Sequence, residues 1–243
     1  MKILGIIPAR YASTRFPGKP LADILGKPMI QHVYERAKMS EYLCDVLVAT
    51  DDRRIHDCVT GFGGYAVMTG SELPNGTARC EEALRLCGSD AEAVINIQGD
   101  EPLLDPVMID EVAGLLRDYG DECATLCREL HGDPANPNAV KVVLSQDWHA
   151  LYFSRSLIPY KRNRSSLPFY EHIGIYGYTV GFLKEYVSLP GTPLSDAESL
   201  EQLKILEHGR KIRVKLTSST RESIGVDTPE DLVRVREIMN AEI

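Results

Sequence analysis

A basic loop near the N-terminus is the clearest chemical feature of the sequence. Arg10, Arg15 and Lys19 lie within residues 8–20, which contain no acidic residue. Clustered cations suit a polyphosphate, because arginine grips phosphate oxygens with paired donors and lysine acts as a mobile point charge. The alternative is a solvated loop with scattered cations. The spacing matches neither a P-loop nor a dinucleotide glycine motif, which disfavours an ordinary ATPase or nicotinamide dehydrogenase.

Two aspartates that follow short apolar segments are candidate ligands for a divalent cation. Asp100 comes after the strand predicted at residues 94–97, and Asp227 comes after a short apolar segment that is also predicted to be a strand. Gly99 would let the backbone approach a ligand, and carboxylate oxygens are the ligands that Mg²⁺ prefers. Either aspartate could instead cap a helix or begin a turn. Only the fold decides whether two loops so far apart in the chain converge.

Other polar residues stand where a binding role and a structural role are both open. The Asn-Gly-Thr turn at residues 75–77 opens a predicted helix, and its backbone amides could read a nucleobase edge, although such turns are common. His172 and Tyr176 lie four apart on a predicted strand and therefore share one face, either core or pocket. Arg155 follows an apolar strand and needs either water or an anion.

The first half of the chain alternates apolar runs with helical patterns. Buried strands are predicted at residues 3–7, 46–49, 65–68 and 94–97, and helices around residues 30–37, 55–62, 80–87 and 109–116. This alternation predicts parallel βαβ units, and hence a three-layer, Rossmann-like, mostly parallel α/β sheet. Ligands of such sheets bind beyond the carboxyl ends of the strands, which is where the candidate residues lie.

The second half has a different pattern, with several strands and few long helices. Strands are predicted at residues 123–126, 140–144, 151–153, 173–179 and 211–217, and a last helix from residue 228. One helix over about 195–208 carries Glu201 and Gln202, for which a solvated face is the default interpretation. We expect a single domain over residues 1–243, with a small dimerisation and pocket-forming region around 136–190, most probable over 136–164.

Composition narrows the classes of protein further. The 243 residues carry a net charge of -8, which argues against a generally basic nucleic-acid binder. The N-terminal apolar run at residues 3–7 is too short for a membrane span or a signal-peptide core. Six cysteines without a C-x-x-C pair predict reduced thiols in a cytoplasmic protein rather than a disulfide framework.

One ordered series of motifs resembles a known family. Residues 6–21 read Ile-Ile-Pro-Ala-Arg-Tyr-Ala-Ser-Thr-Arg-Phe-Pro-Gly-Lys-Pro-Leu, which resembles the sugar-activating cytidylyltransferases, in particular the CMP-KDO synthetases (KDO is 3-deoxy-manno-octulosonate). The likeness continues in order through residues 48–52, 75–77, 96–102, 151–155, 158–159, 172–178, 200–203 and 225–231. Each motif alone is weak, but the series covers nearly the whole chain.

The resemblance implies a nucleotidyltransferase that works as a homodimer with Mg²⁺. The family joins CTP to the anomeric hydroxyl of KDO and releases pyrophosphate, early in lipopolysaccharide synthesis. The residues it implies for the nucleotide are Ala9, Arg10, Arg15, Lys19, Asn75, Gly76, Thr77 and Arg79. Its catalytic set would be Lys19, Asp100 and Asp227, with the two aspartates as Mg²⁺ ligands. Its sugar pocket would comprise Gln98, Arg155, His172, Tyr176, Glu201 and Gln202, with Arg155 facing the KDO carboxylate.

One position departs from the family pattern. The family usually has an acidic residue after the Gly-Thr of the 75–77 turn, whereas this chain has Ala78, before Arg79. Any contact of that carboxylate with base, ribose or Arg79 is lost. Two other functions therefore stay open: a cytidylyltransferase for another acidic sugar, such as amino-KDO or a sialic acid, and a nucleotide-binding protein that has lost catalysis.

Overall fold

A computed structural model describes residues 1–12, 16–221 and 224–241. Its main sheet contains β1 (Ile3–Ala9), β4 (Leu43–Thr50), β5 (Ala66–Met68), β6 (Ala93–Asn96), β7 (Cys123–Glu129), β8 (Lys141–Leu144), β9 (Ala150–Ser154), β10 (Tyr170–Thr179) and β11 (Arg213–Leu216). The strand order is β11-β7-β10-β6-β1-β4-β5, with β8 beside β10 and β9 beside β8. A separate short hairpin pairs β2 (Asp23–Ile24) with β3 (Lys27–Pro28).

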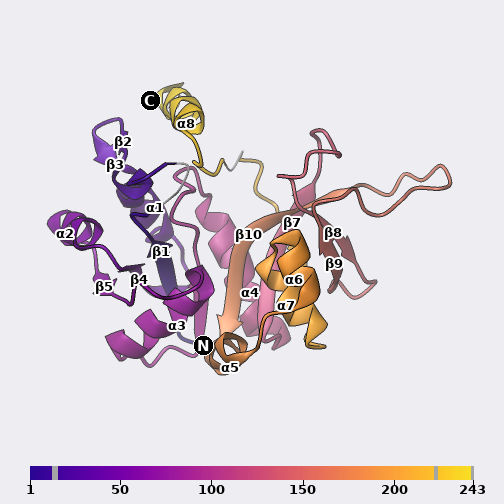
Figure 1. Cartoon of the computed structure of the whole chain (residues 1–243), viewed down its shortest axis with the longest axis horizontal. Coiled ribbons are helices and arrows are strands. Elements are labelled where there is room, and N and C mark those ends of the chain that lie inside the picture. The colour runs from indigo at the N-terminus through magenta and orange to yellow at the C-terminus, as the bar shows by residue number, and fades with distance from the viewer. Residues whose placement is uncertain (13–15, 222–223, 242–243) are drawn as a thin grey trace.

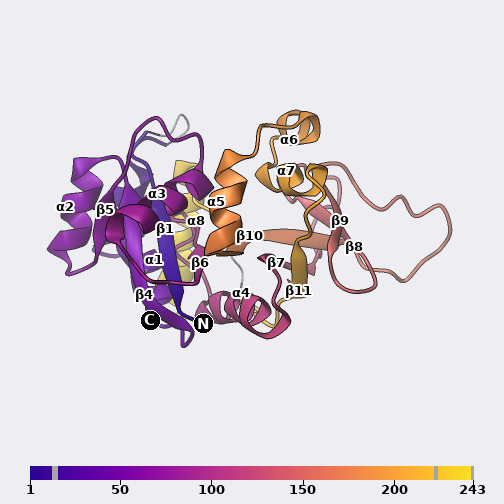
Figure 2. The same ribbon diagram turned by 90° about the horizontal axis from the view of Figure 1, so that it is seen from below.

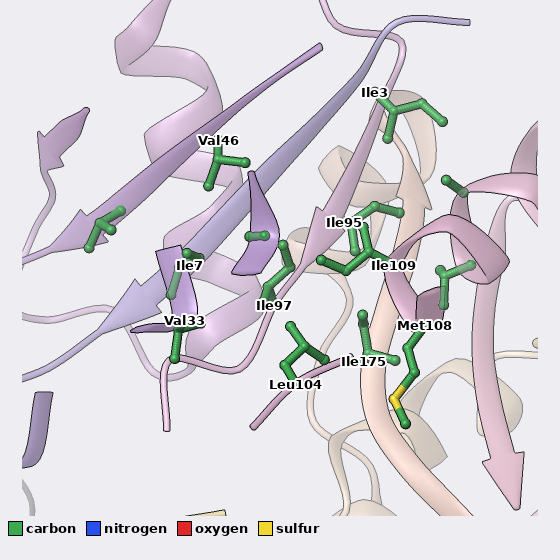
Figure 3. Close-up of a cluster of buried hydrophobic side chains, with 14 of the residues drawn as sticks. Ile3, Ile7, Val33, Val46, Ile95, Ile97, Leu104, Met108, Ile109 and Ile175 are labelled. Atoms are coloured by element: carbon green, nitrogen blue, oxygen red, sulfur yellow. The ribbon is translucent and has the colours of Figure 1, made fainter. Parts of the chain in front are cut away.

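Helices cover both faces of the sheet and complete three layers (Figures 1 and 2). Buried side chains on one face come from α1 (Met29–Ala37), α2 (Arg53–Gly61) and α4 (Pro106–Tyr119). Those on the other face come from α3 (Gly76–Cys87), α5 (Val180–Ser188) and α7 (Glu201–Glu207). Figure 3 shows the first cluster, in which Ile7 and Ile95 of the sheet and Met108 of α4 are all buried. The fold class predicted from the sequence is therefore confirmed.

The first half matches its predicted pattern closely. Strand β1 pairs in parallel with both β4 and β6, and β4 pairs in parallel with β5. Strands β1 and β6 and the second half of β4 are almost entirely buried, because helices cover them on both sides, and they read as apolar runs for the same reason. Strand β5 lies at the sheet edge and buries only Ala66. Their carboxyl ends meet along one edge, so the loops after β1 and β6 are neighbours.

The second half departs from the prediction in three ways. The expected helix at 195–208 is wrong, since α6 (Pro193–Glu198) and α7 are separated by Ser199, whose φ of 50° is left-handed. Helix α5 was not predicted. The apolar segment before Asp227 is not a strand, and Val226 instead donates a single backbone hydrogen bond of 2.8 Å to the Asp100 carbonyl.

The region expected to form an added lobe contains β8, β9, β10 and α5. Strand β10 lies antiparallel between β6 and β7, and it also pairs with β8. The long connection from β9 to β10 extends away from the sheet (Figure 1). The remaining elements are the 3₁₀-helix η1 (Lys19–Leu21) and α8 (Pro229–Ala241), which packs near β2. Within the described residues, no helix has the length and apolar character that a membrane span requires.

Candidate active site

The loops that follow β1 and β6 touch at the carboxyl edge of the sheet. A Cβ atom added at Gly99 would lie 2.8 Å from the Pro8 carbonyl oxygen and 3.3 Å from the Ile7 side chain. Only glycine fits this approach, because the nearest neighbour is backbone. The contact places the basic loop after β1 beside Asp100.

Lys19, Asp100 and Asp227 converge at this edge. Lys19 Nζ lies 2.6 Å from Asp100 Oδ2 and 3.1 Å from Asp227 Oδ1, and it also donates to the Val226 carbonyl at 3.1 Å. Burial alone would lower the pKa of Lys19, but the two carboxylates outweigh it and raise that pKa above its usual value. The two aspartates predicted from distant loops are thus brought within reach of one cation.

A cavity of about 440 Å³ opens beside Lys19, Asp100 and Asp227, and we call it the smaller cavity. Ala9, Arg10 and Lys19 line it together with Asp100 and Asp227. Arg10 Nη2 donates a hydrogen bond of 2.7 Å to the Leu73 carbonyl, which holds the guanidinium at the cavity wall. The predicted partner Arg15 lies outside the described residues.

The 75–77 turn forms the start of α3. Asn75 is its N-cap, and its side-chain oxygen accepts a hydrogen bond of 2.8 Å from the Ala78 amide. Gly76 lines both the smaller cavity and the larger one described below, whereas Thr77 lines only the larger. The cap therefore fixes the backbone at the wall between the two cavities.

Arg79 is placed differently from the other predicted nucleotide residues. Its side chain is fully buried and is not part of the lining of either cavity. Burial lowers its pKa, and its guanidinium donates to Asp51 at 3.1 Å and to the Thr69 hydroxyl. Asp51 thus supplies a carboxylate to Arg79 in a chain that carries Ala78 in place of the family's acid.

All six predicted sugar residues line one larger cavity of about 1090 Å³. They are Gln98, Arg155, His172, Tyr176, Glu201 and Gln202. This larger cavity shares Gly76, Gln98, Asp100 and Asp227 with the smaller one. The two cavities therefore meet at the pair of aspartates, with the basic loop on one side and a polar chamber on the other.

The walls of the larger cavity are held by hydrogen bonds to backbone. Gln98 Nε2 donates to the Gly174 carbonyl at 2.9 Å. The Arg155 guanidinium donates to the carbonyls of Pro137, Glu198 and Ser199, at 3.1, 2.8 and 3.3 Å. Five N–H bonds are available on a guanidinium, so two that make no hydrogen bond to the described residues remain for a ligand. Arg155 thus fastens the cavity rim and keeps donors for an anion.

Two titratable groups of the larger cavity have shifted pKa values. Burial raises the pKa of Glu201, although Thr77 donates to it at 3.3 Å. Burial lowers the pKa of His172 to about 3, so its ring is neutral at physiological pH. The His172 ring lies 5.0 Å from that of Phe153 and 5.2 Å from that of Tyr176, centroid to centroid.

Two residues that sequence reasoning did not single out belong to this site. Asn96, at the end of β6, is 3% exposed and lines the larger cavity, and its Oδ1 is buried with no hydrogen-bond partner among the described residues. Lys141 is fully buried and donates to the carbonyls of Asn136, Ala139 and Arg155 at 2.8, 2.7 and 2.6 Å. A polar residue ending an apolar strand was a usable signal for Asn96, whereas nothing local marks Lys141.

Comparison with known proteins gives a consistent result. A family model described as "Cytidylyltransferase" matches residues 4–212. A 3-deoxy-manno-octulosonate cytidylyltransferase from Parabacteroides distasonis is 50% identical, and an 8-amino-3,8-dideoxy-manno-octulosonate cytidylyltransferase from Shewanella putrefaciens is 49% identical; each match covers 96% of both chains.

A solved structure of CMP:2-keto-3-deoxy-manno-octonic acid synthetase complexed with CTP is 43% identical, with a TM-score of 0.94 and complete coverage of both chains. A cytidylyltransferase from Leptospira borgpetersenii, 16% identical with a TM-score of 0.66, shares the fold. The family match over most of the chain, joined to the site described above, shows that this chain belongs to the cytidylyltransferases.

Proposed function

We propose that the protein transfers CMP from CTP to the anomeric hydroxyl of KDO, giving CMP-KDO and pyrophosphate. The observation that carries this proposal is the meeting of two cavities at Asp100 and Asp227. The smaller cavity, which has the basic loop on one side, suits a triphosphate, and the larger, polar one suits a sugar acid. The full-length likeness to a KDO-activating synthetase complexed with CTP supports the same assignment.

The reaction needs no covalent enzyme intermediate. The anomeric oxygen forms a bond to the α-phosphorus of CTP, the bond from that phosphorus to pyrophosphate breaks, and the hydroxyl proton passes to solvent. Catalysis of such a transfer consists mainly of positioning and charge neutralisation. Arg10, Arg15 and Lys19 would hold the triphosphate and stabilise the leaving pyrophosphate.

The residues present fit a bound Mg²⁺. Asp100 and Asp227 already direct carboxylate oxygens at one cationic atom, Lys19 Nζ, from 2.6 and 3.1 Å. Mg²⁺ in phosphate sites is commonly held by one or two carboxylates together with substrate phosphates. When bound, it would neutralise phosphate charge and make the anomeric hydroxyl easier to ionise. Lys19 would then be released toward the triphosphate.

The roles of the larger cavity follow from its donors and acceptors. Arg155, whose guanidinium keeps two N–H bonds for a ligand, would bind the KDO carboxylate. Gln98, His172, Tyr176, Glu201 and Gln202 would contact the sugar hydroxyls. On the nucleotide side, the backbone at Asn75, Gly76 and Thr77 would recognise the base.

The alternative with direct support is an amino sugar as acceptor. Relatives named for 8-amino-3,8-dideoxy-manno-octulosonate are 49% identical, against 50% for a relative named for KDO. Incubation with CTP and each of KDO, its 8-amino analogue and a sialic acid, followed by mass spectrometry of the products, tests the assignment. We expect CMP-KDO as the main product. A product formed only from the amino sugar or from sialic acid would contradict it.

We also propose that the protein works as a cytoplasmic homodimer upstream of lipopolysaccharide. All six cysteines are free thiols, in keeping with a reducing compartment.

Leu151, Tyr160 and Leu167 are 62, 87 and 49% exposed near the projecting β9–β10 connection, and a second copy would cover them. Sedimentation should show a dimer that Leu151→Glu weakens and Val233→Glu, on exposed α8, does not. A monomeric wild type would contradict this proposal.

A further inference from the structure

Thr125 and His172 form a hydrogen-bonded pair in which His172 lines the larger cavity and Thr125 lies outside that lining. Thr125 lies in β7, is fully buried, and has its Oγ1 3.0 Å from His172 Nε2. The same hydroxyl is 2.7 Å from the Ile175 carbonyl and 3.1 Å from the Ile173 carbonyl. The register of β10 against β7 shifts between Ile173 and Tyr176, so Thr125 closes an irregularity of the strand that carries His172.

The hydroxyl of Thr125 has one proton and three neighbours. Carbonyl oxygens can only accept, so the hydroxyl of Thr125 donates its proton to a carbonyl of β10. The Ile175 carbonyl is the nearer of the two. The oxygen of Thr125 is then left to accept from His172, which requires a proton on Nε2. The ring is neutral, so its other nitrogen, Nδ1, carries a lone pair.

The second ring nitrogen faces a different environment. His172 lines the larger cavity, and Nδ1 makes no hydrogen bond to the described residues. Nδ1 of His172 is not fully buried, so it keeps access to the cavity. Phe153 and Tyr176 pack against the ring and limit its rotation. Nδ1 of His172 therefore offers a hydrogen-bond acceptor to a ligand in the larger cavity.

We propose that Thr125 is a positioning residue that fixes His172 as the Nε2–H tautomer, so that Nδ1 accepts a hydrogen bond from a hydroxyl group of the acceptor sugar. This inference rests on the proposed function. It assigns His172 to a sugar hydroxyl and away from the sugar carboxylate, because a lone pair attracts a donor and repels an anion. Arg155, a pure donor, remains for the carboxylate.

The direct test is long-range proton–nitrogen NMR on protein labelled with ¹⁵N-histidine. The His172 signals are assigned by their absence from His172→Gln. We expect a protonated Nε2 and an unprotonated Nδ1 in the free protein, and a shift of the Nδ1 resonance on addition of KDO. A proton on Nδ1, or an Nδ1 resonance unmoved by a sugar that is turned over, would overturn the proposal.

Variants of Thr125 separate positioning from folding. Thr125→Val removes the hydroxyl at nearly constant shape and should mix the His172 tautomers, raising KM for the sugar about tenfold while KM for CTP changes less than twofold. Thr125→Ser should restore both readouts. If Thr125→Val left both the His172 tautomer and the KM for the sugar unchanged, the proposal would be overturned. Should that variant not fold, the wild-type spectrum and its response to KDO decide alone.

The two proposals fail in different ways. If no acceptor supports pyrophosphate release but the wild-type ring is still the Nε2–H tautomer, the proposed function is wrong and the sugar-binding role of Nδ1 falls with it. If turnover with KDO is normal but the proton lies on Nδ1, only the role of Thr125 and His172 is wrong.

Discussion

At the scale of single residues, charge balance organises the reaction centre. Asp100 and Asp227 would repel one another if Lys19 did not lie between them, and the backbone bond from Val226 to Asp100 keeps their loops together. A cation is thus part of the site before any substrate arrives. In the proposed reaction, the same pair of carboxylates would become available to Mg²⁺ once Lys19 binds phosphate.

Asp100→Asn tests this arrangement. The substitution removes one negative charge from the cation site and leaves its size unchanged, so turnover should fall at least about a hundredfold. Thermal unfolding and CTP binding by calorimetry should stay near the wild-type values. Asp90→Asn, at an exposed ion pair with Lys2, is the matched control and should keep full activity. Turnover near wild type in Asp100→Asn would remove that residue from the reaction centre.

His172 makes a second prediction through its pKa. The unfolded chain binds a proton at this residue below about pH 6.5, whereas the folded ring stays neutral down to about 3. Between these values the unfolded state binds more protons, so stability falls as pH falls. The wild type should lose up to about 1.4 kcal/mol of unfolding free energy per pH unit more than His172→Gln does.

Denaturant unfolding at pH 6.5, 5.5 and 4.5 measures this difference. His131→Gln, at an exposed histidine, should follow the wild-type slope. Equal slopes for wild type and His172→Gln would mean that His172 titrates normally in the folded protein.

At the scale of elements, β10 decides where the sugar residues lie. It enters the sheet between β6 and β7, and thereby sets Tyr176 opposite Asn96 at the end of β6 and His172 opposite Cys127 in β7. The break between α6 and α7 turns Glu201 and Gln202 into the larger cavity. Lys141 then ties the 136–139 segment to Arg155, which completes the rim.

Lys141→Met removes that tie. Three carbonyls lose a charged donor in a buried place, so unfolding free energy should drop by about 3 kcal/mol. Because the rim belongs to the larger cavity alone, KM for the sugar should rise about tenfold with little change in KM for CTP. Lys184→Met, on the exposed side of α5, is the control. A parallel rise in both KM values would show that Lys141 has no selective effect on the rim.

The sequence allowed some elements to be predicted and others not, for physical reasons. Strands β1 and β6 and the second half of β4 were predictable because burial on both faces forces continuous apolar runs. The helix break at Ser199 was not, since it coincides with tertiary hydrogen bonds that the Glu198 carboxylate accepts from the Ser154 hydroxyl and the Arg155 amide. The hydrogen bonds from Lys141 to three backbone carbonyls were not predictable either, because they also depend on contacts between segments that the fold brings together.

At the scale of the whole molecule, the sheet acts as a frame with one functional edge. Candidate residues from the basic loop, from the end of β6 and from the segment before α8 were identifiable as polar breaks after apolar runs. Their convergence on Lys19 required the fold, because pairing of distant loops leaves no local pattern. The net charge of -8 makes the local basic loop stand out as a site for an anionic substrate.

The most direct test of the account is pyrophosphate release from each of the four nucleoside triphosphates with Mg²⁺, measured with and without KDO. We expect release only when CTP and KDO are both present, with little from ATP, GTP or UTP. Release from CTP without any sugar, or equal release from all four nucleotides, would contradict it. CTP binding without release in the presence of KDO would contradict the transfer to KDO while leaving the nucleotide side of the site in place.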